Sequence, residues 1–470
     1  MRVATWLFLA FTALYLFTGG GHFYASDDVQ KLAVLDALAD HHTVAIPDGW
    51  VRGAGGLRYA WFPLGASLVM LPGWLLGKLA ALVLPVPAVF AVRFCVAMQN
   101  AVISAALVTL FFAACRRLGA PRGGALVATL GLGLGSLVWP YAKTAWSEPT
   151  TALALYGGLA ALWLARERPR WLVVAGVGLA LAVAIRQEFL LAALGAIAWW
   201  CWQTRGRGLL WLATPLALVG VAALAYDAVR YGTPFSFPSY HLPQKKVVMA
   251  EGRFSWSLRN FYQYTVSPNQ GIFWYSPVTL ACFGGFRGGV AGLLALSLGP
   301  LALFYMAGWG LSSWAWGLRY AYVFVPALVL PLAWAPRKLA TPLVALGLGV
   351  QLLAVLHNPL ELYERELARV PGLTIQQLMI QRAHAPLWLA AKDAPATLAR
   401  GRAALVDPQP APPGPLEHHQ GLPDVWWLLV LLAPVPRALV AVVAALMALA
   451  GLVSAWALAR ALRAEARAGV

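Results

Sequence analysis

The sequence predicts an all-α membrane protein that crosses the bilayer many times. Of its 470 residues, 60% are hydrophobic and 11% are charged, and the mean hydropathy is +0.68. Apolar runs of about 18 residues or more, long enough for a membrane-spanning helix, recur along the whole chain. Because a bilayer admits only segments whose backbone polar groups bond internally, these runs are expected to be helices.

The net charge of +17 does not indicate a nucleic-acid partner. The Lys and Arg residues occur in short clusters between apolar runs, and no segment gathers them into a basic domain. Such clusters mark the cytoplasmic loops of membrane proteins. The four cysteines lie in or beside apolar segments without metal-ligand spacing, so we expect neither disulfides nor a zinc site.

Charge asymmetry sets the expected topology, because basic loops stay inside. The clusters concerned are Arg116-Arg117-Arg122, Arg166-Arg168-Arg170, Arg205-Arg207, Arg337-Lys338 and Arg460-Arg463-Arg467. Arg2 is also placed inside, and no convincing cleavage site follows the first apolar run, so we expect a retained anchor. This first span, over residues 3–20, exits outward and leaves residues 22–62 outside.

The apolar segment 63–86 is expected not to cross the membrane. A crossing here would put the Arg116-Arg117 cluster outside, against the charge rule. Pro63, Gly65 and Pro72 also interrupt the segment. We therefore predict a surface or re-entrant helix within a first outer loop over residues 21–87.

The remaining runs bring the total to about twelve spans with both termini inside. They lie near residues 88–115, 123–140, 149–164, 171–185, 189–202, 209–229, 271–286, 288–308, 320–334, 341–356 and 425–459. We expect residues 1–340 to form a catalytic transmembrane module. Residues 341–470 would add C-terminal spans around an outer loop, 357–424, whose polar and Pro-rich sequence predicts a small, loosely ordered cap.

Ionisable and aromatic residues gather at the outer ends of the predicted spans. They are Asp27, Asp28, Arg58, Tyr59, Lys143, Glu148, Arg186, Glu188, Trp316, Arg319 and Tyr320. Charges at such positions are costly unless paired or wetted, so several on one side indicate a polar cavity. The alternative is that each side chain reaches separately to the interface, and for Lys143 alone we favour that interpretation.

Asp27 and Asp28 differ from the other members of this set. An acidic pair directly after a helix C-terminus is electrostatically unfavourable. A less favoured alternative is that Asp28 only caps a following helix over residues 29–39. The alternation of apolar positions with Lys31 and Asp36 predicts that this helix is amphipathic and lies on the membrane. A carboxylate held at that height could accept a proton from an attacking hydroxyl.

Five stretches resemble the GT-C glycosyltransferases, most closely the bacterial branch near the protein O-mannosyltransferases and the lipid A aminoarabinose transferases. They are Tyr24-Ala25-Ser26-Asp27-Asp28; residues 57–65; Trp146-Ser147-Glu148-Pro149; Tyr231-Gly232-Thr233-Pro234-Phe235; and residues 271–277 with Trp316-Gly317-Leu318-Arg319-Tyr320. The resemblance covers roughly the first 340 residues, and the order of the motifs is more specific than any one of them.

The resemblance implies an enzyme that uses a polyprenyl-phosphate sugar as donor and carries its general base in the first outer loop. Asp27 or Asp28 is then that base, and Asp27 is favoured. Arg58 corresponds to a basic residue that contacts the donor phosphate in relatives. Arg186 and Arg319 are further candidates, because a guanidinium would stabilise the departing phosphate.

The predicted substrate-binding residues are Tyr59, Glu148, Glu188, Trp316 and Tyr320. The two glutamates would bind acceptor hydroxyls or neutralise the arginines, and the second role is favoured for Glu188. Asp27, Asp28 and Glu148 could also supply the oxygen ligands of Mg²⁺ or Mn²⁺, which some members of the superfamily use. Nothing in the sequence fixes such a geometry, so no metal is assigned.

The leading interpretation is an inverting glycosyltransferase. It would act on a lipid, glycan or protein acceptor at the outer, periplasmic face of the cytoplasmic membrane. A flippase or transporter of lipid-linked saccharides is one alternative, although repeat-related halves, typical of transporters, are not evident. An O-antigen polymerase or ligase is another, but it would centre on a large loop rich in Arg and His.

Overall fold

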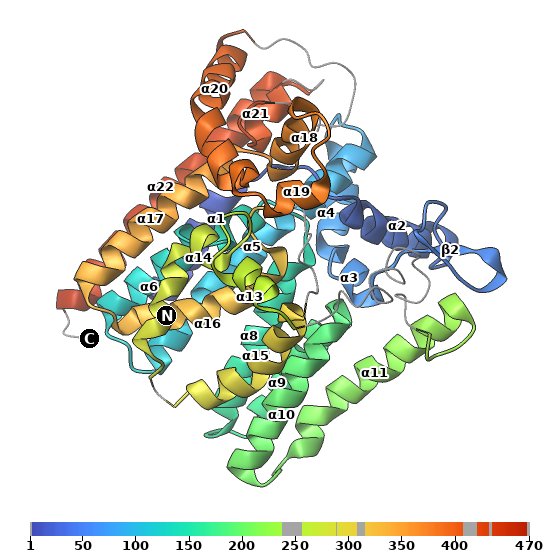
Figure 1. Cartoon of the computed structure of the whole chain (residues 1–470), viewed down its shortest axis with the longest axis vertical. Helices are drawn as coiled ribbons and strands as arrows, with labels where there is room; N and C mark the ends of the chain where they lie inside the picture. Colours follow the sequence, from blue (N-terminus) through green and yellow to red (C-terminus); the bar gives the residue numbers. More distant parts are fainter. Residues whose placement is uncertain are drawn as a thin grey trace.

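The computed structural model describes residues 2–236, 256–287, 289–307, 315–407, 421–431 and 435–467, and most of this part is helical (Figure 1). Five helices within it are long and apolar enough to cross a membrane. They span Leu64–Val83, Ala88–Arg117, Leu209–Tyr231, Arg337–Leu356 and Arg437–Ala464. Shorter apolar helices accompany them. The predicted class, an all-α polytopic membrane protein, is confirmed.

The elements follow one another along the chain with 3-10 helices, labelled η, between many of the α-helices. Up to residue 231 they are α1 (Arg2–Phe17), α2 (Ser26–His41), β1 (Val51–Arg52), η1 (Ala54–Gly56), β2 (Arg58–Tyr59), α3 (Leu64–Leu68), α4 (Leu71–Val83), α5 (Ala88–Arg117), α6 (Arg122–Leu134), α7 (Val138–Tyr141), α8 (Ser147–Ala165), α9 (Trp171–Ile185), η2 (Gln187–Phe189), α10 (Leu190–Thr204) and α11 (Leu209–Tyr231). After it come α13 (Leu258–Thr265), α14 (Ile272–Tyr275), η4 (Pro277–Gly284), α15 (Ala291–Met306), η5 (Arg319–Phe324), α16 (Val325–Val329), η6 (Leu330–Trp334), α17 (Arg337–Leu356), α18 (Pro359–Arg369), α19 (Ile375–Ile380), η7 (Arg382–His384), α20 (Pro386–Val406), α21 (Trp426–Leu431) and α22 (Arg437–Arg467).

The two ends of the chain meet along α1. Leu16, near the end of α1, packs in the same cluster as Val440, near the start of α22. Further along, Gly451 faces Ala13, and Leu458 packs on the cluster that contains the first residues of α1. The two helices are therefore antiparallel, and both termini lie at one end of the bundle.

The basic loops also gather at one end of the bundle. Arg117, after α5, forms an ion pair with Glu167, after α8. Gly208 lies against Leu172 at the start of α9, and Gly123 lies beside Arg337 at the start of α17. Because α8 has 19 residues, its other end is about 28 Å away at 1.5 Å per residue. That distance matches the hydrocarbon thickness of a bilayer.

The segment 63–86 folds as α3 and α4, with a break that Gln99 of α5 stabilises. The Gln99 side chain donates to the carbonyl of Val69 and accepts from the amide of Gly73. α4 packs on the first part of α5, where Gly73 and Gly77 meet Val96 and Val92, whereas the chain just after α1 meets α5 further along, where Gly19 lies against Met98. α4 thus lies beyond the end of α1. Since length and composition would also allow α3–α4 to cross, the non-crossing helix stays a prediction.

The expectation of a single span over residues 271–286 is wrong. α14 stops after Tyr275, Ser276 is extended, and η4 starts at Pro277. Proline cannot donate the amide that would continue a helix. The hydroxyl of Ser276 instead accepts from the amide of Leu137, so the break joins this segment to the turn after α6.

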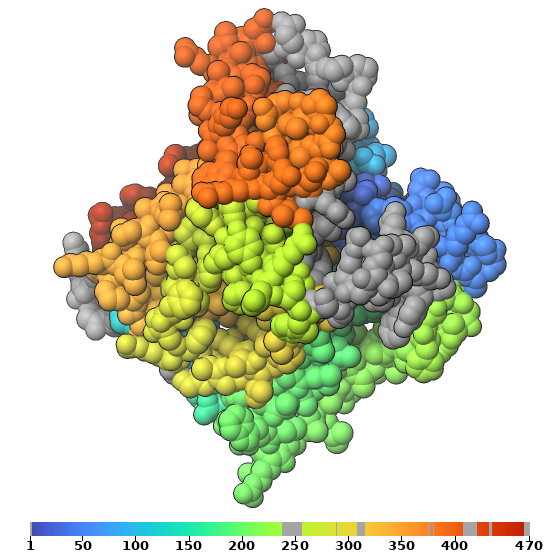
Figure 2. Space-filling view, in the orientation of Figure 1, coloured from blue at the N-terminus to red at the C-terminus, as the bar shows by residue number. Residues whose placement is uncertain are grey.

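The described part of the outer loop, residues 357–407, is helical, so the expectation of a loosely ordered cap is wrong there. Asn358 caps α18 through its side chain, and Thr374 and Gln377 form a capping box on α19. Polar helices of this kind are fixed by caps and ion pairs more than by hydropathy. In Figure 2 this cap, coloured orange, projects from the rest of the protein. Its Pro-rich end, 408–415, lies outside the described residues.

Candidate active site

Asp27 and Asp28 belong to the first turn of α2. α1 ends at Phe17, a loop follows, and α2 begins at Ser26 with Ala25 at its N-cap. No side chain caps this helix, so the alternative in which Asp28 serves only as a cap does not hold. Both carboxylates instead occupy the helix end at which the macrodipole favours negative charge.

The two carboxylates have different surroundings. The Asp27 side chain is 25% exposed, whereas Asp28 is fully buried. One oxygen of Asp28 accepts from Lys31 Nζ at 3.0 Å. Burial raises the pKa of Asp28, and the nearby cations Lys31 and Arg319 offset part of that rise. A substrate entering from the cavity can therefore reach Asp27 but not Asp28.

Lys31 was expected on a solvated face of this helix, and that expectation is wrong. Its ammonium is buried between Asp28 and the ring of Phe62, 4.9 Å from the ring centroid. A lysine in such a position requires a counter-ion, because an unpaired buried charge is very costly. α2 is therefore covered on both faces.

Arg319 connects Asp27 to Glu148. Its Nη1 lies 3.0 Å from Oδ2 of Asp27, and its Nε lies 2.6 Å from Oε1 of Glu148. The guanidinium also covers the ring of Trp146 at 4.7 Å. The turn before it uses Gly317 at a φ of +67°, where a side chain would meet Tyr275, so glycine is required to present Arg319 in this way.

Arg186 extends the network from the other side. It lies between α9 and η2 in extended conformation, pairs with Glu148 and donates from Nε to Glu188 at 2.9 Å. Its guanidinium stacks on Tyr320 at 4.5 Å. Three carboxylates and two arginines thus share one network that is largely buried. Pairing of this kind offsets the cost of removing the charges from water.

A cavity of about 540 Å³ opens beside the network. Its charged and polar side includes Asp27, Arg186, Glu188, Arg319 and Tyr320. The lining also includes the aromatic side chains of Trp50, Trp61, Phe62 and Phe304. A mostly apolar pocket with a few convergent charged groups is typical of a small-molecule site.

Three of the predicted site residues lie elsewhere among the described residues. Arg58 is exposed on β2 and donates to the carbonyl of Gly49. Tyr59 is buried against Tyr231, and Trp316 is buried against Tyr275. None of the three is among the described residues that line the cavity, so their roles stay predictions.

Sequence reasoning missed several residues near the site. Trp61 and Phe62 fall inside one of the stretches that carry the family resemblance, so that stretch was the available signal. Tyr305, which donates to Glu188 at 3.2 Å, had no such signal. Lys143 was expected to reach the interface, and this is wrong, because it is buried and paired with Asp424 at 2.9 Å.

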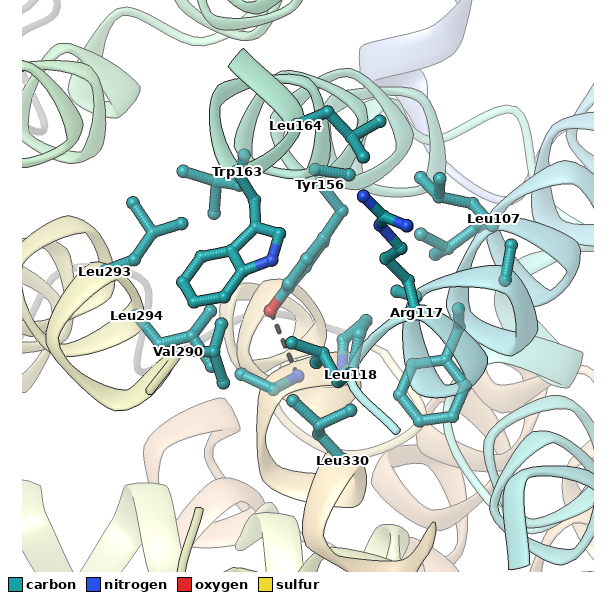
Figure 3. Close-up of a pocket in the computed structure, with 18 residues that line it drawn as sticks. Leu107, Arg117, Leu118, Tyr156, Trp163, Leu164, Val290, Leu293, Leu294 and Leu330 are labelled. Atoms are coloured by element: carbon teal, nitrogen blue, oxygen red, sulfur yellow. Dashed lines mark hydrogen bonds between the residues drawn. The ribbon is translucent and has the colours of Figure 1, made fainter. Parts of the chain in front are cut away.

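A second cavity, of about 320 Å³, lies towards the end that carries the basic loops (Figure 3). Leucines of α5 and α15 surround it together with Tyr156 and Trp163 of α8. Among the described residues that line it, Arg117 has the only charge, and it is paired with Glu167. The described lining of this cavity therefore offers no carboxylate to act as a base.

The described part of the chain contains no group of three His, Cys, Asp or Glu residues placed to hold a metal ion. Asp27 and Glu148 are bound to Arg319, and Asp28 is bound to Lys31.

The fold and the site define a polytopic membrane protein with a pocket of paired carboxylates and arginines at the end opposite its basic loops. No protein-family model and no curated protein matches the sequence. Among solved structures the chain is similar to ArnT from Cupriavidus metallidurans bound to undecaprenyl phosphate. The identity is 15%, the TM-score is 0.49, and the match covers 97% of this chain and 77% of that one. A likeness at this level says nothing about the activity of this chain.

Proposed function

We propose that the protein is a membrane glycosyltransferase that moves a sugar from a polyprenyl-phosphate donor to an acceptor hydroxyl, with inversion. The observation that supports this most is the ion pair of Asp27 with Arg319 at the wall of the larger cavity. A base and a phosphate-binding group are thereby held side by side, as this reaction requires. The motifs that resemble the GT-C enzymes agree with the same assignment.

In the proposed reaction Asp27 is the general base. The acceptor oxygen attacks the anomeric carbon from the face opposite the phosphate, and its proton passes to the Asp27 carboxylate. The bond between the anomeric carbon and the phosphate oxygen breaks, and both electrons leave with the phosphate. The leaving group changes from a phosphodiester monoanion to a phosphomonoester dianion, so a nearby guanidinium stabilises the transition state more than the ground state.

Arg319 and Arg186 are the proposed phosphate-binding residues. Both are bound to carboxylates in the ligand-free protein, so a donor phosphate competes with Asp27 for Arg319. Donor binding would then release Asp27 to act as the base. Glu148 contacts both guanidinium groups and would keep them correctly placed relative to each other. The aromatic residues that line the cavity would pack on the sugar or on the first isoprene units.

The proposed location of the reaction is the outer face of the cytoplasmic membrane. The basic loops lie together at the end of the bundle opposite Asp27, and basic loops face the cytoplasm. A lipid-linked donor suits this side, where nucleotide sugars are absent.

The deciding experiment is mass spectrometry of lipids and glycans from a deletion strain. We expect one sugar to be missing, wild-type protein to restore it, and Asp27→Asn to fail. Asp40→Asn, which changes an exposed carboxylate on the same helix, is the matched control. An unchanged glycan profile in the deletion strain would favour a transporter, and restoration by Asp27→Asn would remove Asp27 from the role of base.

A further inference from the structure

A second buried network lies just before the candidate base in the chain. Asp424, which precedes α21, accepts from Tyr24 Oη at 2.5 Å and lies 2.8 Å from His22 Nε2. Lys143 Nζ lies 2.9 Å from the same carboxylate. All four side chains are buried. A residue 400 positions away in sequence thus holds the loop that leads to Asp27.

The residues after Asp424 form hydrogen bonds to the carbonyls at the end of α1. The amide of Trp426 donates to the carbonyl of Gly19 at 2.7 Å, and its indole donates to the carbonyl of Leu16 at 2.9 Å. The indole of Trp427 donates to Phe17 at 3.1 Å. The last carbonyls of a helix have no partner within the helix, so these donors fix where α1 stops and where the loop begins.

Electrostatics make Asp424 the centre of this network. Burial alone would raise the pKa of its carboxyl, but Lys143 and His22 outweigh burial and hold the pKa well below its usual range. Lys143 also donates to the backbone carbonyls of Val355 and Asp424, both at 2.6 Å. The Asp424 carboxyl is therefore ionised in the folded protein at neutral pH.

The network reaches the candidate site by two routes. Tyr24 is only three residues before Asp27 in the chain. The ring of Tyr24 also contacts the ring of Trp146 at a centroid distance of 6.4 Å, and Trp146 carries the guanidinium of Arg319 on its face. Asp424 itself is not among the described residues that line the larger cavity, so it acts through these neighbours.

We propose that Asp424 is a positioning residue that sets the placement of Asp27 against Arg319 by holding His22 and Tyr24. This inference rests on the proposed function, and it assigns to the C-terminal part of the chain a role in the chemical step. Residues 1–340 would then be incomplete as a catalytic unit. The competing explanation is that the network only stabilises the fold.

Enzyme kinetics on folded, purified full-length variants separate these two explanations. Tyr24→Phe removes one hydroxyl and keeps the ring, and we expect kcat to fall about tenfold with the donor KM nearly unchanged. For Asp424→Asn the expected fall is about 100-fold, the size of effect that a 1 Å misplacement produces. Asp393→Asn is the control, because the Asp393 carboxylate pairs only with Arg365 and Arg400 of the cap among the arginines of the described residues. This variant should leave kcat unchanged.

A double variant isolates positioning from stability. Asp424→Leu with Lys143→Met replaces the buried ion pair by apolar groups, which often preserves stability. We expect thermal stability near wild type and a kcat as low as that of Asp424→Asn, because His22 and Tyr24 still lack their anchor. Recovery of kcat along with stability would mean that the network has only a structural role, and would overturn the inference.

Hydrogen exchange of the amides over residues 19–31 provides a readout that needs no substrate. Asp424→Asn and Tyr24→Phe should both speed exchange there, and Asp393→Asn should not. Unchanged exchange and unchanged kcat in both variants would overturn the inference even if Asp27→Asn abolishes transfer. Full activity of Asp27→Asn would instead count against the proposed function, while faster exchange would still show that Asp424 positions this loop.

Discussion

Asp27 and Arg319 neutralise each other in the ligand-free protein, and this pairing limits what either can do alone. The Oδ2 atom of Asp27 that binds Arg319 is not free to accept a proton from a substrate. A guanidinium that already binds two carboxylates must exchange a partner before it can hold a phosphate. At the scale of single residues, donor binding and activation of the base are therefore one event in the proposed mechanism.

Asp27→Asn should consequently separate catalysis from binding. Loss of the base is expected to lower kcat by about 10²–10⁴-fold. Loss of the negative charge removes the competitor for Arg319, so the affinity for a polyprenyl-phosphate sugar should stay the same or increase several-fold. Single-turnover kinetics and direct binding to the purified variant measure the two effects.

Asp28→Asn gives the matched comparison, because it removes a neighbouring carboxylate that is bound to Lys31. We expect it to lower stability, since it leaves a buried ammonium without its counter-ion, and to leave donor affinity unchanged. A loss of donor affinity in Asp27→Asn would contradict the exchange of partners at Arg319.

At the scale of elements, α18 shows how the cap depends on charge. Glu361 is buried in its first turns, accepts from the amide of Gly421 and pairs with Arg365 at 3.1 Å. Burial raises the pKa of Glu361 to about 7, although Arg365 and the Gly421 amide act against that rise. The cap is therefore built around a carboxyl group that titrates near neutral pH.

The stability of the folded chain should fall as the pH rises through about 7 because of this group. A carboxyl whose pKa is higher in the folded than in the unfolded state stabilises the fold below its unfolded pKa, and loses that contribution as the pH passes the folded pKa. A shift of this size is worth on the order of 3 kcal/mol between pH 4 and 8. Thermal unfolding at a series of pH values measures it.

Glu361→Gln resembles the protonated form, so its stability should vary less with pH than that of the wild type. Glu364→Gln, at an exposed position of the same helix, should follow the wild-type curve. Parallel curves for all three proteins would show that Glu361 does not titrate in this range.

At the scale of the whole molecule, the sidedness of the bundle decides where the chemistry takes place. Asp40 is exposed in α2, the helix that begins with Asp27, and Arg168, after α8, is exposed at the end with the basic loops. In a background without the native cysteines, a membrane-impermeant thiol reagent should label Asp40→Cys in intact cells. Arg168→Cys should require permeabilisation. Labelling of Arg168→Cys alone in intact cells would place the candidate site in the cytoplasm.

Much of the architecture could be predicted because it depends on local composition. The apolar runs that became α5, α8, α9 and α11 were predicted to within a few residues, since each run is long enough to satisfy its own backbone. The predictions failed where contacts between distant segments decide, as at Ser276, where a bond to Leu137 joins two broken helices. They also failed for residues 357–407, where side chains at the helix N-termini and ion pairs hold the helices in place.

The sequence alone determined that this chain is a helical membrane protein and that Asp27, Glu148, Arg186 and Arg319 belong to one candidate set, because hydropathy, charge asymmetry and motif order are properties of the chain. Only the tertiary structure decided which of two adjacent carboxylates faces a cavity, and that Asp424 and Lys143 hold the loop before it. These outcomes depend on burial and on pairing between residues hundreds of positions apart, and no local pattern encodes them.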